Sequence, residues 1–224
     1  MSGHSKWATI KRDKGANDAK RGAVFTKLAN AITIAVRSGG GITDPGFNFK
    51  LRLAIDKAKQ ANMPKDNIQK SIDRGANKNS GAQLSEAVYE GFGPGGVAII
   101  AETISDNNTR TATELRTVFS KNGGNLGSPG SVAYLFSRVG EIEGETLEKA
   151  MEVGALDFDE GTIYTRPEDL HRIGEALGKQ GSLIYRPNKE ALVNLNPEDK
   201  GQLEKLLAAI DELDDVQNVF VNSL

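Results

Sequence analysis

Apolar residues in the first third of the chain recur every three or four positions, which is the spacing of a helix with one buried face. Residues 17–38, residues 48–61 and a segment that begins at Pro64 are therefore expected to be helices. Residues 39–41 are all glycine, which readily adopts the left-handed conformation that ends a helix. This pattern predicts a small helical domain at the start of the chain.

Beyond residue 84 the pattern alternates between strands and helices. Short stretches rich in apolar and β-branched residues are expected to be strands: residues 97–104, 131–136, 140–143, 162–166, 182–186 and 216–221. Stretches with helical spacing lie between them: a segment between the capping residues 107–109 and the glycines at 123–124, and residues 147–153, 168–179 and 198–213.

The middle of this series has a recognisable order. A turn is expected at residues 159–161, just before the strand at 162–166. We therefore interpret residues 140–186 as strand, helix, strand, strand, helix, strand, which is the split βαβ or ferredoxin-like arrangement. The last helix and strand need a sheet to join, and the strands before residue 137 are the candidates. We therefore expect an α+β protein with a three-helix domain at residues 1–79, a discontinuous α/β domain at 80–137 with 190–224, and an inserted ferredoxin-like domain at 138–189.

Charge is divided unevenly along the chain. Residues 1–80 hold 16 Lys and Arg against 6 Asp and Glu, whereas residues 81–224 hold 12 against 24. The whole-chain net charge of −2 hides a basic part joined to an acidic part. Such asymmetry favours a polyanionic partner, and nucleic acid is the usual one.

Candidate nucleic-acid contacts follow from this basic part. Lys50 and Lys57 are seven residues apart, as are Arg52 and Lys59, so each pair shares a helix face. Trp7 lies among cations, where it could stack on a base or a sugar or could instead anchor a core. The expected binding residues are His4, Lys6, Trp7, Lys11, Arg12, Lys14, Lys20, Arg21, Lys27, Lys50, Arg52, Lys57, Lys59 and Lys65. Contacts of this kind mostly position phosphates, and the alternative is a solvated basic surface.

Two glycine-rich segments resemble phosphate-binding loops. Residues 91–96 lack a following Gly-Lys-Ser/Thr and precede a strand, so we interpret them as a tight loop into that strand. Residues 123–131 could present backbone amides to phosphate, although such loops are more often turns between elements.

Catalytic groups are sparse. The chain has no cysteine, and its two histidines, His4 and His171, lie far apart in the sequence. Residues 157–161 are acidic but lack the spacing of a calcium loop, so no metal site and no cofactor are expected. The cluster Asp211, Glu212, Asp214 and Asp215 is interpreted as a solvated face, which could keep this part off nucleic acid or bind a basic protein.

Location and assembly follow from what the sequence lacks. The longest strictly apolar run, residues 97–101, is far shorter than the ~20 residues of a membrane span. The basic N-terminus has no apolar segment behind it and does not resemble a secretory signal. We expect a cytoplasmic protein without membrane contact, and a monomer because dimer-forming heptads are absent.

Six segments resemble the signature segments of the YebC/PmpR family: Gly3–Trp7, Asn62–Ile68, Tyr89–Gly96, Asp106–Thr111, Phe119–Gly127 and Gly130–Phe136. The resemblance is dense over residues 1–137 and looser beyond. Between residues 44 and 52, Gly46 replaces the acidic residue and Phe49 the proline that are usual in the family.

This resemblance implies three domains, the third inserted into the second, and no enzyme activity. Bacterial members are commonly described as probable transcriptional regulators that bind DNA. Other members are described as translation factors that act at the ribosome, including relief of stalling at proline-rich stretches, and the mitochondrial relatives as translational activators of cytochrome oxidase synthesis.

The expected function is therefore a non-enzymatic, nucleic-acid-binding regulator of gene expression that acts on DNA through its basic N-terminal domain. No helix-turn-helix recognition helix is visible in the sequence, which counts against DNA. The alternative is a ribosome- or rRNA-binding translation factor, because a basic arm joined to acidic lobes suits rRNA on one side and protein on the other. An enzyme is the least favoured class.

Overall fold

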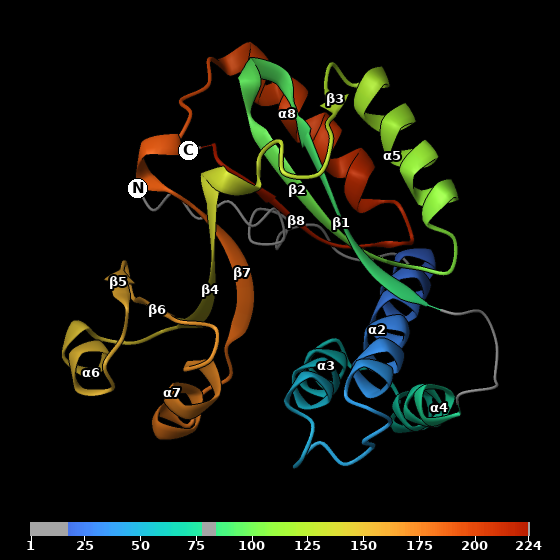
Figure 1. Ribbon diagram of the computed structural model, residues 1–224, viewed down its shortest axis with the longest axis vertical. Helices are drawn as coiled ribbons and strands as arrows, with labels where there is room; N and C mark the ends of the chain where they lie inside the picture. Colours follow the sequence, from blue (N-terminus) through green and yellow to red (C-terminus); the bar gives the residue numbers. More distant parts are fainter. Residues whose placement is uncertain (1–17, 78–83, 224) are drawn as a thin grey trace.

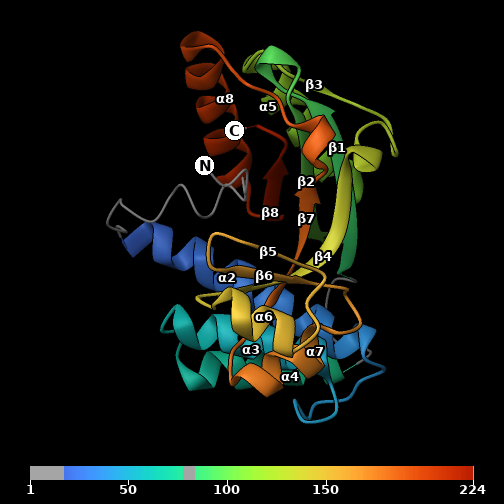
Figure 2. The same ribbon diagram turned by 90° about the vertical axis from the view of Figure 1, so that its left-hand side faces the viewer.

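The computed structural model of the chain describes residues 18–77 and 84–223 (Figure 1). It has an α+β fold with two antiparallel sheets, in which the N-terminal helical region lies below the sheet that contains β1 and beside the sheet that contains β5 (Figures 1 and 2). Within the described residues, no helix has both the length and the apolar character that crossing a bilayer requires.

The helical region contains the helices that the apolar spacing predicts. They are α2 (Asp18–Ser38), α3 (Phe49–Gln60) and α4 (Lys65–Ala76). Pro64 is the cap before α4 rather than its first residue. Their apolar faces meet in one buried core, which contains Ile32, Ala35, Val36, Leu51, Ala54, Ile55, Ala58, Met63, Ile68 and Ile72.

Asn48 joins α2 to α3. Its side-chain oxygen accepts a hydrogen bond from the Leu51 amide at 3.1 Å, which caps the start of α3. Its amide group donates to the carbonyls of Ala35 and Ile42, each at 3.0 Å, and so satisfies the end of α2 and the following loop. Helix α3 therefore begins at Phe49 although the family's usual proline is absent there.

The first sheet has the strand order β3-β1-β2-β8, and all of its neighbours are antiparallel. Its strands are β1 (Ser85–Phe92), β2 (Ala98–Ser105), β3 (Asn125–Leu126) and β8 (Val216–Val221). Helices α5 (Asn108–Lys121) and α8 (Pro197–Asp211) cover one face. The expectation that the C-terminal strand pairs with a strand before residue 137 is confirmed, because β8 pairs with β2.

The second sheet has the strand order β5-β6-β4-β7 and is also antiparallel. Its elements are β4 (Phe136–Glu143), α6 (Leu147–Glu152), β5 (Asp157–Asp159), β6 (Thr162–Thr165), α7 (Leu170–Leu177) and β7 (Ser182–Pro187). The predicted strand, helix, strand, strand, helix, strand order is confirmed. Short 3₁₀ turns η1 (Pro94–Gly96), η2 (Ala133–Leu135) and η3 (Lys189–Ala191) connect the larger elements.

One sequence-based expectation about strands is wrong, and one long strand was not predicted. Residues 131–136 do not form a strand, because they contain η2 and only Phe136 belongs to β4. Strand β1 was not expected at all, since Ser85–Phe92 contains two acidic residues and a glycine among its apolar ones. Burial alternates along the first part of β1, as expected for a strand with one solvated face.

The two sheets share a core. Ala98, Ile100 and Phe220 of the first sheet pack with Phe136, Val139, Tyr164 and Ile184 of the second. The rings of Tyr185 and Phe220 meet edge to face, with centroids 5.5 Å apart. The helical region joins the first sheet through a smaller apolar cluster of Ile34, Leu84 and Ile104.

Helices α2 and α4 cross closely at Gly75, which gives the first testable prediction. A Cβ added to Gly75 would lie 2.7 Å from Val36 Cβ and 2.8 Å from the Thr33 carbonyl oxygen. Gly75→Ala should therefore destabilise the protein by about 1–3 kcal/mol, measured by urea unfolding. The control is Gly201→Ala in α8, where an added Cβ meets nothing within 4 Å. This change should be neutral or stabilising by about 0.5–1 kcal/mol, and equal effects of the two changes would contradict the packing argument.

Candidate nucleic-acid interface

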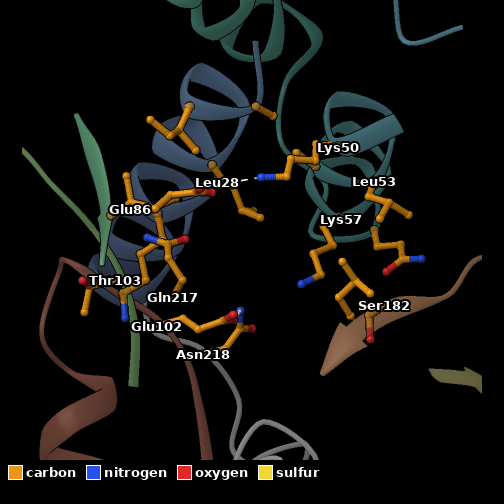
Figure 3. Close-up of a pocket in the computed structure, with 18 of the residues that line it drawn as sticks. Leu28, Lys50, Leu53, Lys57, Glu86, Glu102, Thr103, Ser182, Gln217 and Asn218 are labelled. Atoms are coloured by element: carbon orange, nitrogen blue, oxygen red, sulfur yellow. Dashed lines mark hydrogen bonds and ion pairs between the residues drawn. The ribbon is translucent and has the colours of Figure 1, made fainter. Parts of the chain in front are cut away.

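A cleft of about 1330 Å³ lies where the helical region and the two sheets meet (Figure 3). Helices α2 and α3 form one wall, to which Lys27, Lys50 and Lys57 contribute. The opposite wall comes mainly from β1, β2 and β8 and includes Glu86 and Glu102. Figure 3 shows Lys50 and Lys57 on α3 across the cleft from these two carboxylates.

The lysines of the helical wall are engaged within the molecule. Lys50 Nζ lies 3.6 Å from a Glu86 carboxylate oxygen, and both side chains are more than half exposed, at 56% and 52%. An ion pair this exposed contributes little to stability. Lys27 Nζ donates a 2.6 Å hydrogen bond to the carbonyl of Asp211 at the end of α8. These contacts cross the cleft from the basic part of the chain to the acidic part.

The acidic wall is held by the contact between the sheets. Glu102 on β2 forms an ion pair with Arg138 on β4, with 2.8 Å between Nη1 and Oε1. The Asn218 amide on β8 donates to the other oxygen of Glu102 at 2.8 Å. The Arg138 guanidinium also lies over the Tyr185 ring, 4.4 Å from its centroid. The Glu102 carboxylate is thus fixed in position at the cleft.

Helix α3 also touches α7. Arg52 Nη2 lies 2.7 Å from His171 Nε2, and Arg52 Nη1 lies 3.8 Å from a Glu175 oxygen. The rings of Phe49 and His171 are 5.1 Å apart between centroids. Beside them, the side-chain amide of Gln60 donates to Gln180 at 3.2 Å. Arg52, an expected nucleic-acid contact, therefore makes an intramolecular contact here.

The remaining expected binding residues lie in other places. Lys59 forms a 3.9 Å ion pair with Asp56 on α3, and Lys65 is exposed in the first turn of α4. Lys20 and Arg21 belong to the first turn of α2. His4, Lys6, Trp7, Lys11, Arg12 and Lys14 lie outside the described residues. Of the described candidates, only Lys27, Lys50 and Lys57 line the cleft together.

The first glycine-rich segment is a structural feature, as expected. Its first two residues end β1, and Pro94 to Gly96 form the η1 turn that leads into β2. A Cβ added to Gly91 would lie 2.6 Å from a ring carbon of Phe119 on α5. Glycine is required there because the Phe119 ring packs directly on the strand.

The second glycine-rich loop binds a carboxylate of its own chain. The buried Glu90 side chain accepts hydrogen bonds from the amides of Gly130, Val132 and Ala133, at 2.7, 2.7 and 2.8 Å. Burial alone would raise the pKa of Glu90, but these three N–H donors lower it below its usual value. Because these amides point at Glu90, residues 131–135 form a turn rather than a strand, and the same amides are not available to a phosphate.

The acidic cluster near the end of α8 is only partly a solvated face. Asp215 is buried, and it accepts hydrogen bonds from Ser105 Oγ at 2.9 Å, Thr111 Oγ1 at 2.6 Å and Arg110 Nη2 at 3.0 Å. Burial alone would raise its pKa, but these donors lower it. The interpretation as a solvated face is wrong for Asp215, which ties β2 and α5 to the start of β8.

Residues 18–77 and 84–223 contain no grouping typical of a metal site. No three His, Asp or Glu side chains gather there in a way that could hold a metal ion. His171 faces Arg52, Phe49 and Glu175 at the contact between α3 and α7, with no nucleophile among these neighbours. The geometry that the described residues offer is a charged cleft between packed elements.

The contribution of Glu90 to stability should depend on pH. Glu90→Gln should destabilise the protein by about 1–3 kcal/mol at pH 7, because the new amide group cannot accept all three N–H donors. A lowered folded-state pKa gives stability above the unfolded value of about 4.3, and that stability is lost as the pH falls through the folded value. The difference in the free energy of unfolding between wild type and variant, measured by urea unfolding, should therefore become smaller below about pH 4. The control is Glu114→Gln, because Glu114 is exposed. If the difference in unfolding free energy between wild type and Glu90→Gln did not change with pH, the three N–H donors would not be stabilising an ionised Glu90.

Known proteins match this chain over nearly its whole length. Residues 5–78 match the N-terminal domain of the TACO1/YebC protein, and residues 84–223 match the TACO1/YebC second and third domain. Relatives named "Probable transcriptional regulatory protein" include one from Acidithiobacillus ferrooxidans, 47% identical over 240 aligned positions that cover 99% of this chain and 94% of the relative. Another, from Rubrobacter xylanophilus, is 47% identical and covers 99% and 95%.

A solved structure agrees with these matches. The crystal structure of a conserved hypothetical protein from Aquifex aeolicus has a TM-score of 0.85 and 43% sequence identity, and the match covers 97% of this chain and 96% of that one. Sequence and fold therefore agree over the helical region and both sheets. The chain belongs to the TACO1/YebC family.

Proposed function

We propose that the protein is a non-enzymatic regulator of gene expression that binds DNA through its basic N-terminal region. The division of charge carries this proposal, since residues 1–80 have ten more cations than anions and residues 81–224 have twelve more anions than cations. The field of the basic part attracts phosphates, while the acidic part limits how the molecule lies on them. The relatives' name, probable transcriptional regulatory protein, supports a role in transcription.

The arrangement of the described cations also supports this proposal. Lys27, Lys50 and Lys57 share one wall of the cleft, and Lys59 and Lys65 are exposed on α3 and α4. All five belong to the helical region, so one small unit carries them. We propose residues 1–79 as this nucleic-acid-binding domain, 80–137 with 190–224 as a second domain, and 138–189 as a third. The protein would act as a cytoplasmic monomer.

The buried polar groups support a role without catalysis. Glu90 and Asp215 have their oxygens occupied by backbone or side-chain donors that join secondary-structure elements. Their lowered pKa values follow from these structural hydrogen bonds, and neither carboxylate is poised to exchange a proton near pH 7.

The experiment that tests the proposal measures binding to a fluorescently labelled DNA duplex by anisotropy at several salt concentrations. Lys11, Arg12 and Lys14 changed together to Ala should weaken binding to every duplex sequence. The slope of log K against log salt should become shallower by about 0.9 for each phosphate contact that is lost. The changes should act alike on all sequences because phosphate contacts carry no base information.

A matched control removes the same charge from the acidic part. Lys189, Lys200 and Lys205 are exposed and lie beyond residue 80. Their joint replacement by Ala should leave the salt slope unchanged. An equal loss in both triple variants would mean that net charge alone, rather than the N-terminal region, determines binding, and would refute the proposal.

A further inference from the structure

Three contacts border the cleft. The helical region meets the first sheet through Ile34, Leu84 and Ile104, all buried. The two sheets meet through the shared apolar core described above. The helical region then meets α7 through Arg52, His171 and Glu175. Lys50 and Lys57 therefore line a cleft that is bounded by all three parts of the molecule (Figure 3).

The contact with α7 is the weakest of the three. The first two contacts bury apolar side chains, which is the dominant source of stability at an interface. At the third contact, Phe49 alone among the described residues of the helical region packs on the apolar core beneath α7, and it is only partly buried. The polar side chains there are partly to largely exposed, at 31% for Arg52, 41% for His171 and 66% for Glu175. Ion pairs with this exposure contribute roughly 0–1 kcal/mol. Of these three contacts, this one opens at the smallest cost.

While α3 contacts α7, the cleft does not admit a DNA duplex. Its volume of about 1330 Å³ is small beside a duplex, whose major groove alone is about 12 Å wide. Glu86 and Glu102 face the lysine wall and repel phosphates. In this arrangement the carboxylates of Glu86 and Glu175 occupy the positions beside Lys50 and Arg52 that phosphates would take.

We propose that the contact between α3 and α7 is a latch, and that DNA binds the lysine wall only after the latch opens. This inference rests on the proposed DNA-binding function and adds its regulation. Opening exchanges the pairs Lys50–Glu86 and Arg52–Glu175 for pairs with phosphates, while the apolar contacts at Ile34 and between the sheets remain. The acidic part of the chain thus competes with DNA for the basic part.

The absence of cysteine makes the latch easy to fix covalently. Gln60 and Gln180 are exposed and hydrogen-bonded to each other across the contact. In the full-length chain, Gln60→Cys with Gln180→Cys is joined by a short bismaleimide, and the same variant capped with N-ethylmaleimide is the control. Binding of both forms to a labelled DNA duplex is measured by anisotropy at several salt concentrations.

The crosslinked form should bind about tenfold or more weakly than the capped form, because contacts from Lys27, Lys50, Lys57 and Arg52 are withheld. At about 0.9 per phosphate contact, its salt slope should be shallower by about 3.6. Bound duplex should also slow the crosslinking reaction. Equal affinities and slopes for the two forms would overturn the latch while leaving the DNA-binding function intact. Failure of the capped form to bind at low salt would overturn the DNA-binding function and the latch with it.

A second pair of variants tests the latch without a chemical crosslink. Glu175→Gln weakens the contact to Arg52 and should tighten DNA binding. Glu168→Gln makes the same change of charge at an exposed position in the same part of the chain. The tightening by Glu175→Gln should clearly exceed that by Glu168→Gln. Equal effects would mean that only the net charge matters and would overturn the latch.

Discussion

Strand β2 is buried on both faces, and this burial holds the main parts of the molecule together. Ile99 and Ala101 pack under α5 and α8, whereas Ala98 and Ile100 pack against the second sheet. At its end, Ile104 meets the helical region. One strand therefore positions all three parts, and the outward side chain of Glu102 between them helps to form the cleft. A polar substitution at a buried β2 position would disturb the packing between these parts before it disturbed any binding residue.

The same strand shows what a single sequence can predict. A strand buried on both faces is a continuous apolar run, so β2 was expected from residues 97–104, and helices with one apolar face were expected from their spacing. Strand β1 was not predicted because it contains Gly91, which weakens a strand pattern. The reason for this glycine is its close contact with Phe119, which is distant in the sequence. Residues 131–136 were mistaken for a strand because Glu90, which accepts from the Val132 and Ala133 amides, lies 42 and 43 positions earlier. Asp215 was misjudged for the same reason, since its donors come from residues 105–111.

The candidate site was predictable in its charge and not in its geometry. Composition identifies the basic part, and helical spacing correctly places Lys50 and Lys57 on one face. This face lines a cleft, and Glu86 and Glu102 lie on the opposite wall. The cleft forms because the helical region packs on β2, and no local sequence pattern predicts that packing. Arg52 also shows this limit, because its neighbour His171 is 119 residues away. The structure thus turns a basic surface into one whose cations are partly engaged by acidic side chains of the same molecule.

The proposed control of gene expression through DNA binding can be examined in the protein's own cells. The protein would be crosslinked to whatever nucleic acid it contacts, recovered, and the attached nucleic acid sequenced. We expect the reads to concentrate on chromosomal DNA at a limited set of promoters. Reads that concentrate instead on ribosomal RNA would contradict it and would make the protein a translation factor.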